Sequence, residues 1–108
     1  LINFAIYEII RSASKEKKLY RDKLTNLYNI SYLRKKLVNI DISKYDLLLI
    51  DVDFLEKINN TFGFEKGDRV LVEIAKILLN FKMKHSKDRV IRYGGELFLY
   101  LKYKDEID

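Results

Sequence analysis

Two apolar runs near the C-terminal end of the chain are joined by a pair of glycines. Residues 89–103 read RVIRYGGELFLYLKY, in which segments rich in Val, Ile, Tyr, Phe and Leu flank Gly94-Gly95. Such runs are typical of strands, and glycine supplies the positive φ that a tight two-residue turn needs. The pattern therefore predicts a β-hairpin with a Gly-Gly turn and with Glu96 at its mouth.

A further strand is predicted where apolar residues run almost without interruption from Tyr45 to Val52. A run of this length favours a central strand buried on both faces. Asp51 and Asp53 bracket Val52 at the end of the run, and a carboxylate in that position is capped, paired in a salt bridge or bound to metal. If the second hairpin strand lies antiparallel beside this strand, Asp51 and Glu96 share one rim of the sheet.

Helical spacing of apolar residues marks the other elements. Residues 1–19 predict an amphipathic helix or short coiled-coil segment that either packs on its own domain or connects to an upstream sensor; its apolar positions are Ile2, Ile6, Ile9, Ile10, Ala13 and Leu19. Residues 54–60 predict a short helix, followed by a turn at Thr61–Phe64. Gly67-Asp68 then leads into a longer helix at 69–82. The apolar positions of the longer helix are assigned to the core: Val70, Leu71, Ile74, Ile77, Leu78 and Phe81.

A turn rich in Asp, Asn and Thr occupies Asp22–Asn29, where such side chains bond to the local backbone. Asn29 or Ser31 is placed to cap a helix that runs to about Val38. The buried side of that helix is expected to carry Tyr32, Leu33 and Leu37.

The composition is that of an ordinary globular domain. The 108 residues are 48% hydrophobic and 34% charged, and the net charge of +5 suits an anionic ligand such as a nucleotide. The absence of Cys excludes disulfides and thiolate metal sites. No run approaches the roughly 20 apolar residues that span a bilayer, and no basic stripe with interleaved aromatics predicts nucleic-acid binding. The one histidine, His85, lies in a lysine-rich loop and is expected to be exposed.

Two carboxylates at one rim point to a divalent cation, because like charges close together repel strongly in a poorly solvated site. Oxygen ligands favour Mg²⁺ or Mn²⁺ over zinc, and Mg²⁺ is usually held by one or two carboxylates together with substrate phosphates. The residues therefore predict a magnesium–nucleotide site on an α/β sheet, suited to phosphoryl or nucleotidyl transfer.

Three motifs between Asp22 and about Lys102 resemble the GGDEF domain of diguanylate cyclases, which join two GTP molecules into cyclic di-GMP across an antiparallel homodimer. Residues 22–29, DKLTNLYN, are similar to the family's opening motif D-x-L-T-x-L-x-N. The stretch LLLIDVDFLEKINNTFGFEKGDRVL resembles its metal strand and guanine-binding segment. RYGGELF stands where the family has RYGG followed by two acidic residues and Phe; its signature residues are Gly94, Gly95, Glu96, Leu97 and Phe98.

The resemblance implies a fold of the α/β (α+β) class, a GGDEF-type palm with a central antiparallel sheet flanked by helices. Residues 1–20 are then a connector or signalling helix, and residues 21–108 are the GGDEF domain. The chain begins without Met, ends in DEID and stops before the family's last helices and strands, so the domain is expected to be incomplete at its C-terminal end.

Site residues follow from the same resemblance. The carboxylate of Asp51 and the backbone carbonyl of Val52 are expected to hold Mg²⁺ or Mn²⁺ together with Glu96. Glu96 is also the proposed base for the ribose 3′-hydroxyl. Asn59 and Asp68 match the residues that bind guanine, a role that suits an amide and a carboxylate because the base presents both donors and acceptors.

Several positions depart from the family pattern. Leu97 replaces an acidic residue, and strand alternation places it with Leu99 and Leu101 on an apolar face. Glu56 stands where Lys is usual, which reverses a charge near the triphosphate. The other departures are Phe64 for His, Asn60 for Asp, and His85-Ser86-Lys87-Asp88 in place of the R-x-x-D motif of feedback inhibition. The product-binding site is therefore expected to be weakened or absent.

Two functions are compatible with these departures. One is a degenerate GGDEF module with residual GTP and metal binding and a regulatory or dimerising role; the other is an active diguanylate cyclase that tolerates Leu97. The first is favoured, because losing a charged transition-state contact commonly costs about 10²-fold or more in rate. An unrelated α/β fold with a chance Gly-Gly hairpin is the third interpretation.

The expected partners are GTP, a second copy of the chain and an upstream sensor domain, without nucleic acid and without a membrane span in this chain. The expected location is the cytoplasm, either free or as the cytoplasmic part of a membrane-attached sensor.

Overall fold

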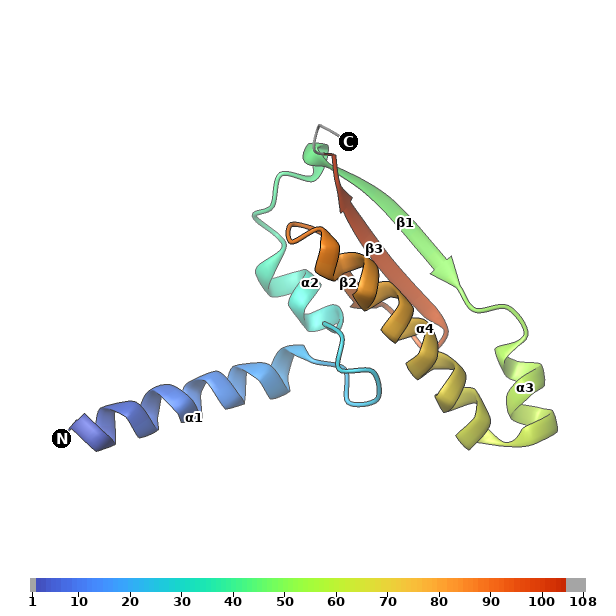
Figure 1. The fold of residues 1–108 in the computed structure, drawn as a ribbon, viewed down its shortest axis with the longest axis horizontal. Coiled ribbons are helices and arrows are strands. Elements are labelled where there is room, and N and C mark those ends of the chain that lie inside the picture. The colour runs from blue at the N-terminus through green and yellow to red at the C-terminus, as the bar shows by residue number, and fades with distance from the viewer. Residues whose placement is uncertain (1, 105–108) are drawn as a thin grey trace.

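The chain forms a three-stranded sheet between helices, with one long helix extending from the body (Figure 1). The computed structural model describes residues 2–104, apart from the side chains at positions 2, 4, 16 and 17. In chain order the elements are α1 (Ile2–Tyr20), α2 (Ile30–Lys36), η1 (Ile42–Lys44), β1 (Tyr45–Asp51), α3 (Leu55–Phe62), α4 (Phe64–Lys84), β2 (Arg89–Arg92) and β3 (Leu97–Tyr103). The predicted apolar side chain of Ile2 and the DEID end lie outside the described residues.

The sheet is antiparallel, with the strand order β1-β3-β2. In the register, Asp51 at the end of β1 pairs with Leu97 at the start of β3. On the other side of β3, Arg92 of β2 pairs with Phe98. The predicted hairpin, and its place beside the first strand, are therefore confirmed.

The link between β2 and β3 differs from the predicted Gly-Gly turn. It spans residues 93–96, and within the described chain the glycine with positive φ is Gly63, not Gly94 or Gly95. The N–H groups of Tyr93 and Gly94 both donate to the carbonyl of Leu97, at 2.9 and 3.3 Å. The strands are thus joined by a loop wider than the primed two-residue turn, so its glycines do not need a positive φ.

The core has a layer on each face of the sheet, because side chains of β3 alternate between the faces. On the face covered by α4, Phe98 and Tyr100 pack with Leu71. On the opposite face, Leu101 packs with Leu37, the C-cap residue of α2. Phe98 and Leu101 are 0% and 1% exposed, and burying a side chain of this size stabilises the fold by about 1.5–3 kcal/mol.

Strand β1 lies at an edge of the sheet, which contradicts the prediction of a central strand buried on both faces. Leu47, Leu48 and Leu49 are 56%, 47% and 63% exposed. In the described part of the chain β1 pairs with β3 alone. Apolar composition indicated burial, but a strand side chain is buried only where another element packs on the face to which it points.

Both helices after β1 differ in their bounds from the prediction. Helix α3 continues to Phe62, and α4 begins at Phe64, before the predicted start. The break falls at Gly63, whose φ of 91° favours glycine. Gly67 lies inside α4, because Asn59 packs against its bare Cα: a Cβ there would stand 1.8 Å from Oδ1 of Asn59. Gly67 was predicted to precede the helix, whereas it lies within it and permits a close contact between the two helices.

The apolar stripe of α4 is only partly core, which corrects part of the prediction. Leu71 is 3% exposed, but Ile77 and Phe81 are 55% and 57% exposed. These two side chains lie outside the strip of the helix that packs against the sheet.

Helices α1 and α2 largely follow the predictions. Asn29 caps α2, accepting from the N–H of Tyr32 at 3.1 Å, and the helix ends at Lys36 rather than near Val38. In α1, Ile6, Ile9 and Ile10 are 50%, 68% and 63% exposed, so the described chain leaves this stripe uncovered. None of the described helices combines the length and apolar character that crossing a bilayer requires.

Candidate active site

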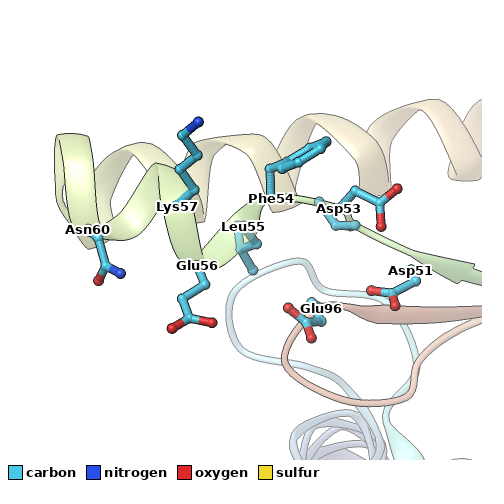
Figure 2. A pocket seen from close by; sticks show the side chains of 9 residues that line it. Asp51, Asp53, Phe54, Leu55, Glu56, Lys57, Asn60 and Glu96 are labelled. Atoms are coloured by element: carbon cyan, nitrogen blue, oxygen red, sulfur yellow. The ribbon is translucent and has the colours of Figure 1, made fainter.

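The end of β1 and the start of β3 bring Asp51 and Glu96 to one rim of the sheet. Asp51 pairs with Leu97, and Glu96 immediately precedes Leu97. The N–H of Val52 donates to the carbonyl of Glu96 at 2.9 Å, which ties the two strands together just beyond that pair. Figure 2 shows the side chains of Asp51 and Glu96 next to each other. The predicted juxtaposition of these two carboxylates is present in the structure.

An open cavity of about 460 Å³ lies at this rim. Its walls come from the end of β1, the turn into α3 and the β2–β3 link; the lining residues are Asp51, Val52, Asp53, Phe54, Leu55, Glu56, Lys57, Asn60 and Glu96. The turn is sharp because Phe54 adopts a left-handed backbone with φ of 64°, which is uncommon for a bulky residue. Leu55, 7% exposed, then anchors the start of α3 in the core.

Acidic side chains dominate the lining. Four of the lining side chains named above carry a carboxylate, on Asp51, Asp53, Glu56 and Glu96, against one basic side chain, that of Lys57. In Figure 2, Glu56 projects on the same side of α3 as Glu96, while Lys57 points the other way. This arrangement attracts cations to the rim and disfavours a free anion.

The donors at the rim fit a hard divalent cation. The carboxylates of Asp51 and Glu96 and the carbonyl of Val52 offer oxygen only, the donor type that Mg²⁺ and Mn²⁺ prefer. Within residues 2–104, no three His, Asp or Glu side chains converge closely enough to hold a metal by themselves. The set therefore suits an ion that keeps water and substrate oxygens among its ligands, rather than a closed structural site.

Asn59 and Asp68 do not line this cavity but lie where α3 contacts α4. Oδ1 of Asn59 is buried and has no hydrogen-bond partner in the described part of the chain. It lies against Gly67, and the next residue, Asp68, is exposed. An unpaired buried oxygen costs about 1–3 kcal/mol. The structure brings these two predicted residues near each other.

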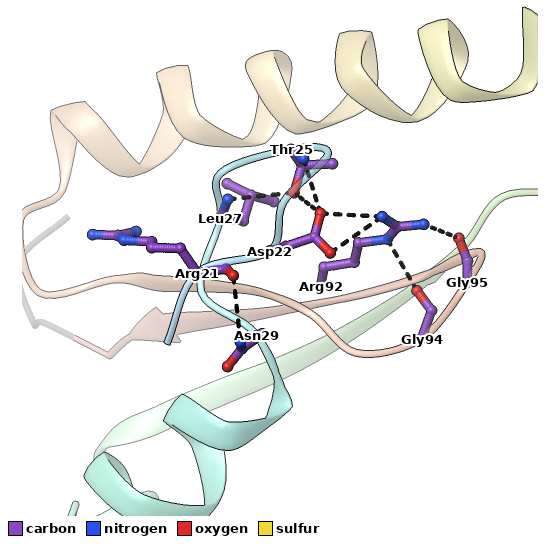
Figure 3. Close-up of polar contacts among 8 residues, drawn as sticks. All are labelled: Arg21, Asp22, Thr25, Leu27, Asn29, Arg92, Gly94 and Gly95. Carbon is purple, nitrogen blue, oxygen red and sulfur yellow. Dashed lines mark hydrogen bonds and ion pairs between the residues drawn. The ribbon is translucent and has the colours of Figure 1, made fainter. Parts of the chain in front are cut away.

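A second polar group holds the β2–β3 link, and its members, Asp22 and Arg92, come from the DKLTNLYN and RYGGELF motifs. The guanidinium of Arg92 donates to the carbonyls of Gly94 and Gly95 and pairs with Asp22 (Figure 3). Burial raises the pKa of Asp22, but hydrogen bonds from Thr25 and Arg92, with the charge of Arg92, outweigh it and leave the pKa below its usual value. The available signal was the charged side chain of Arg92 at the end of β2 that leads into the glycine link.

Asp88, which precedes β2, is fully buried. Its carboxylate accepts from the hydroxyl of Tyr100 at 2.5 Å and from the N–H of Tyr103 at 2.8 Å. Burial and the bond to Asp88 raise the pKa of Tyr100 above its usual value. Asp88 thus has a structural contact that the sequence did not reveal. His85, near it in the chain, is exposed as predicted.

Comparison with known proteins assigns the family. Residues 19–106 match the family described as "Diguanylate cyclase, GGDEF domain". The chain belongs to the GGDEF family. It is 37% identical over 78 residues to diguanylate cyclase A of Treponema denticola, which covers 72% of this chain and 19% of that protein. It is 38% identical over 87 residues to the response regulator PleD of Caulobacter vibrioides, covering 74% and 18%. The chain thus spans less than a fifth of these curated relatives.

Solved GGDEF structures share the fold. Diguanylate cyclase SiaD of Pseudomonas aeruginosa, in complex with its activator SiaC, matches with a TM-score of 0.67 and 32% identity over 98% of this chain and 43% of that one. The S helix-GGDEF-EAL part of LapD from Vibrio cholerae, bound to c-di-GMP, matches with a TM-score of 0.79 over 94% and 25%; at 17% identity it supports the fold alone. The α/β GGDEF fold is confirmed, and the chain is a GGDEF domain of cyclic di-GMP signalling.

Proposed function

We propose that this GGDEF domain is a degenerate module that binds GTP with Mg²⁺ or Mn²⁺ and acts by dimerising or by regulating a neighbouring domain. The observation that carries the proposal is the position of Leu97. It pairs with Asp51 in the sheet, is partly buried and does not line the cavity. An apolar side chain there supplies no charge or ligand, and the loss of one such contact lowers a catalytic rate by about 10²-fold or more.

Glu56 supports the same conclusion. It lines the cavity and projects on the side of Glu96 (Figure 2), at a position where the family usually has lysine. A carboxylate there repels the triphosphate that a lysine would attract. The negative charge of Glu56, beside Asp51 and Glu96, therefore weakens productive GTP binding.

The residues at the rim define the metal-binding part of the proposal. Asp51 and Glu96 would hold the cation, with the carbonyl of Val52 as a further oxygen donor. When bound, the metal supplies charge compensation for the triphosphate. Glu96 is exposed at the mouth of the cavity, where its carboxylate can accept the proton of a ribose 3′-hydroxyl.

Guanine recognition is proposed for Asn59 and Asp68. The unpaired Oδ1 of Asn59 is ready to accept a hydrogen bond, and the exposed carboxylate of Asp68 lies beside the same helix contact. A carboxylate accepts from the N1–H and amino group of guanine together, whereas adenine offers no such pair of donors. Selection for GTP over ATP is the expected result.

The connector and dimer are also proposals. Residues 1–20 would link an upstream sensor to the GGDEF domain at 21–108, in the cytoplasm. The exposed stripe that includes Ile9 would be covered by α1 of a second copy. Sedimentation should then show a dimer for the wild type and for Ser12→Lys, whose position is exposed, and a monomer for Ile9→Lys. A dimer that persists in Ile9→Lys would reject this contact.

The experiment that tests the function is chromatographic detection of cyclic di-GMP from the full-length protein with GTP and Mg²⁺ or Mn²⁺. We expect GTP to bind and product to form at least about 100-fold more slowly than in an intact cyclase. Glu96→Ala is the control, since it removes the proposed metal ligand. Rapid product formation that disappears in Glu96→Ala would overturn the degenerate assignment.

The alternative, an active cyclase, has one observation in its favour. Asp51 and Glu96 still share the rim, and Val52 is bonded to the backbone of Glu96 there. The two carboxylates that are expected to hold metal are therefore both present without the fourth signature residue. The same product assay separates this alternative from the degenerate module.

A further inference from the structure

The side chain of Arg92 forms hydrogen bonds to the backbone of the link between β2 and β3. Its Nε donates to the carbonyl of Gly94 at 3.2 Å, and its Nη2 donates to the carbonyl of Gly95 at 2.9 Å. Its Nη1 reaches both carboxylate oxygens of Asp22, at 3.2 and 3.1 Å. Figure 3 shows the guanidinium between Asp22 and the two glycines. A guanidinium presents its donors in a rigid fork, so these contacts define one orientation of the link.

Asp22 is itself held firmly, which makes it an effective anchor for Arg92. Its carboxylate accepts from the N–H and the hydroxyl of Thr25, both at 2.8 Å. Its own N–H donates to the carbonyl of Leu27 at 2.7 Å. The side chains of Arg92 and Asp22 are 16% and 21% exposed, so the ion pair is better shielded than a surface pair.

These contacts act on Glu96 through the peptide groups on both sides of it. The carbonyl of Gly95 that Arg92 holds belongs to the peptide that carries the N–H of Glu96. The carbonyl of Glu96 accepts from Val52 at 2.9 Å. Within the described residues the side chain of Glu96 makes no hydrogen bond or ion pair. The direction in which its Cα–Cβ bond leaves the chain is therefore set by its backbone, and Gly94 and Gly95 have no side chains that could hold the link by packing.

We propose that Arg92 is a positioning residue for Glu96 and that Asp22 anchors it. The inference rests on the proposed function, in which Glu96 is a metal ligand. Ligand groups need to be held within about 0.5 Å of the productive geometry. Removing an outer contact that orients a ligand typically lowers metal affinity by about 10–100-fold.

The test compares Arg92→Lys with Arg89→Lys in the full-length protein. Lysine at position 92 keeps the charge beside Asp22 but lacks the fork that reaches both glycine carbonyls. Arg89 is a matched control, because its guanidinium also donates to two backbone carbonyls, at the opposite end of β2 from the rim. Mn²⁺ binding is measured by electron paramagnetic resonance without nucleotide. The NMR order parameter of the Glu96 amide is measured without metal.

We expect Arg92→Lys to weaken Mn²⁺ binding by about tenfold and to lower the Glu96 order parameter from about 0.85 toward 0.6. Arg89→Lys should change neither quantity. If the two folded variants behave alike, the positioning role is wrong. If Arg92→Lys does not fold, Asp22→Asn serves instead, because it loosens the anchor and leaves the glycine contacts; a wild-type order parameter in that variant would equally overturn the proposal.

The two measurements separate this inference from the function on which it rests. A wild-type protein that binds neither Mn²⁺ nor GTP would reject the proposed function. The order parameter of Glu96 in the metal-free variants would still decide whether Arg92 positions that residue.

Discussion

The hydroxyl of Tyr100 donates a 2.5 Å hydrogen bond to Oδ2 of Asp88, a residue with 0% exposure. The other carboxylate oxygen accepts from the N–H of Tyr103 at 2.8 Å. Together these bonds join the turn before β2 to the second half of β3. A buried carboxylate needs such donors to replace lost hydration, so the Asp88–Tyr100 pair is part of what holds the hairpin together.

Removing the hydroxyl in Tyr100→Phe should therefore destabilise the domain. The variant keeps the ring in the core but leaves one buried oxygen of Asp88 without its donor, which costs about 1–3 kcal/mol of the free energy of unfolding. Urea denaturation followed by circular dichroism measures the loss. Tyr93→Phe is the control, since Tyr93 is 44% exposed. A loss in Tyr100→Phe no larger than in this control would show that the bond contributes little.

The Asp22–Arg92 pair should make the free energy of unfolding of the domain depend on pH in the acid range. The pKa of Asp22 is raised by burial but lowered more by bonds from Thr25 and Arg92, with a net value below the usual one. Such a group contributes stability above its unfolded pKa, about 3.9, and loses it as the pH falls through the folded pKa.

The free energy of unfolding should therefore fall more steeply between about pH 5 and pH 2 in the wild type than in Asp22→Asn. Urea titrations at a series of pH values measure both slopes. Asp53→Asn removes an exposed carboxylate and serves as the control for the loss of one negative charge. Parallel curves for the wild type and Asp22→Asn would contradict the assigned bonds.

The meeting of Asp51 and Glu96 could be predicted because it depends on local rules. A Gly-Gly link between apolar runs predicts a hairpin, and strand pairing then carries the end of β1 to the start of β3. The alternation of side chains along β3 also predicted that Leu97 shares a face with Leu99 and Leu101, and Leu97 does not line the cavity. The two-residue period of strand side chains and the antiparallel direction of the strands were sufficient to predict these features.

Contacts between distant residues were beyond reach of the same rules. Arg92 and Asp22 lie 70 positions apart, and a motif letter does not tell which groups a guanidinium will reach. Burial of Asp88 depends on the tyrosines of β3, and exposure of Leu48 depends on which elements of the described chain cover its face of the sheet. Gly67 shows the same limit, because only the packing of Asn59 reveals why glycine stands inside α4.

Asp68→Ala should reduce GTP affinity much more than ATP affinity. Its exposed carboxylate is assigned to guanine, and a hydrogen bond to a charged group contributes about 1.5–3 kcal/mol, equivalent to roughly tenfold or more in affinity. Titration calorimetry with each nucleotide measures the effect. Glu65→Ala removes an exposed acid in the first turn of α4 and serves as the charge control. Equal losses for GTP and ATP would remove the guanine assignment.

Gly67→Ala should destabilise the domain, although alanine is the better helix former by about 1 kcal/mol. The new Cβ would lie 1.8 Å from Oδ1 and 2.9 Å from Cγ of Asn59, so that side chain has to move. Overpacking of this kind costs about 1–3 kcal/mol, and GTP binding should fall with it. Gly95→Ala is the control, because an added Cβ there meets nothing within 4 Å. A stabilised Gly67→Ala variant would show that Asn59 is free to rearrange.

Leu97→Glu alone should not produce strong cyclase activity while Glu56 remains. The substitution adds an acidic group near Asp51, with which Leu97 pairs, but the carboxylate of Glu56 still lines the cavity and repels the triphosphate. The double variant Leu97→Glu/Glu56→Lys changes both charges, and we expect it to form cyclic di-GMP at least about tenfold faster than either single variant, since neighbouring sites act non-additively. Product is measured by chromatography with GTP and Mg²⁺. Glu56→Gln removes the negative charge without adding a positive one. It therefore distinguishes the loss of repulsion of the triphosphate by Glu56 from the gain of attraction by a lysine. Full activity in Leu97→Glu alone would mean that Glu56 does not oppose GTP, and the degenerate assignment would then rest on Leu97 only.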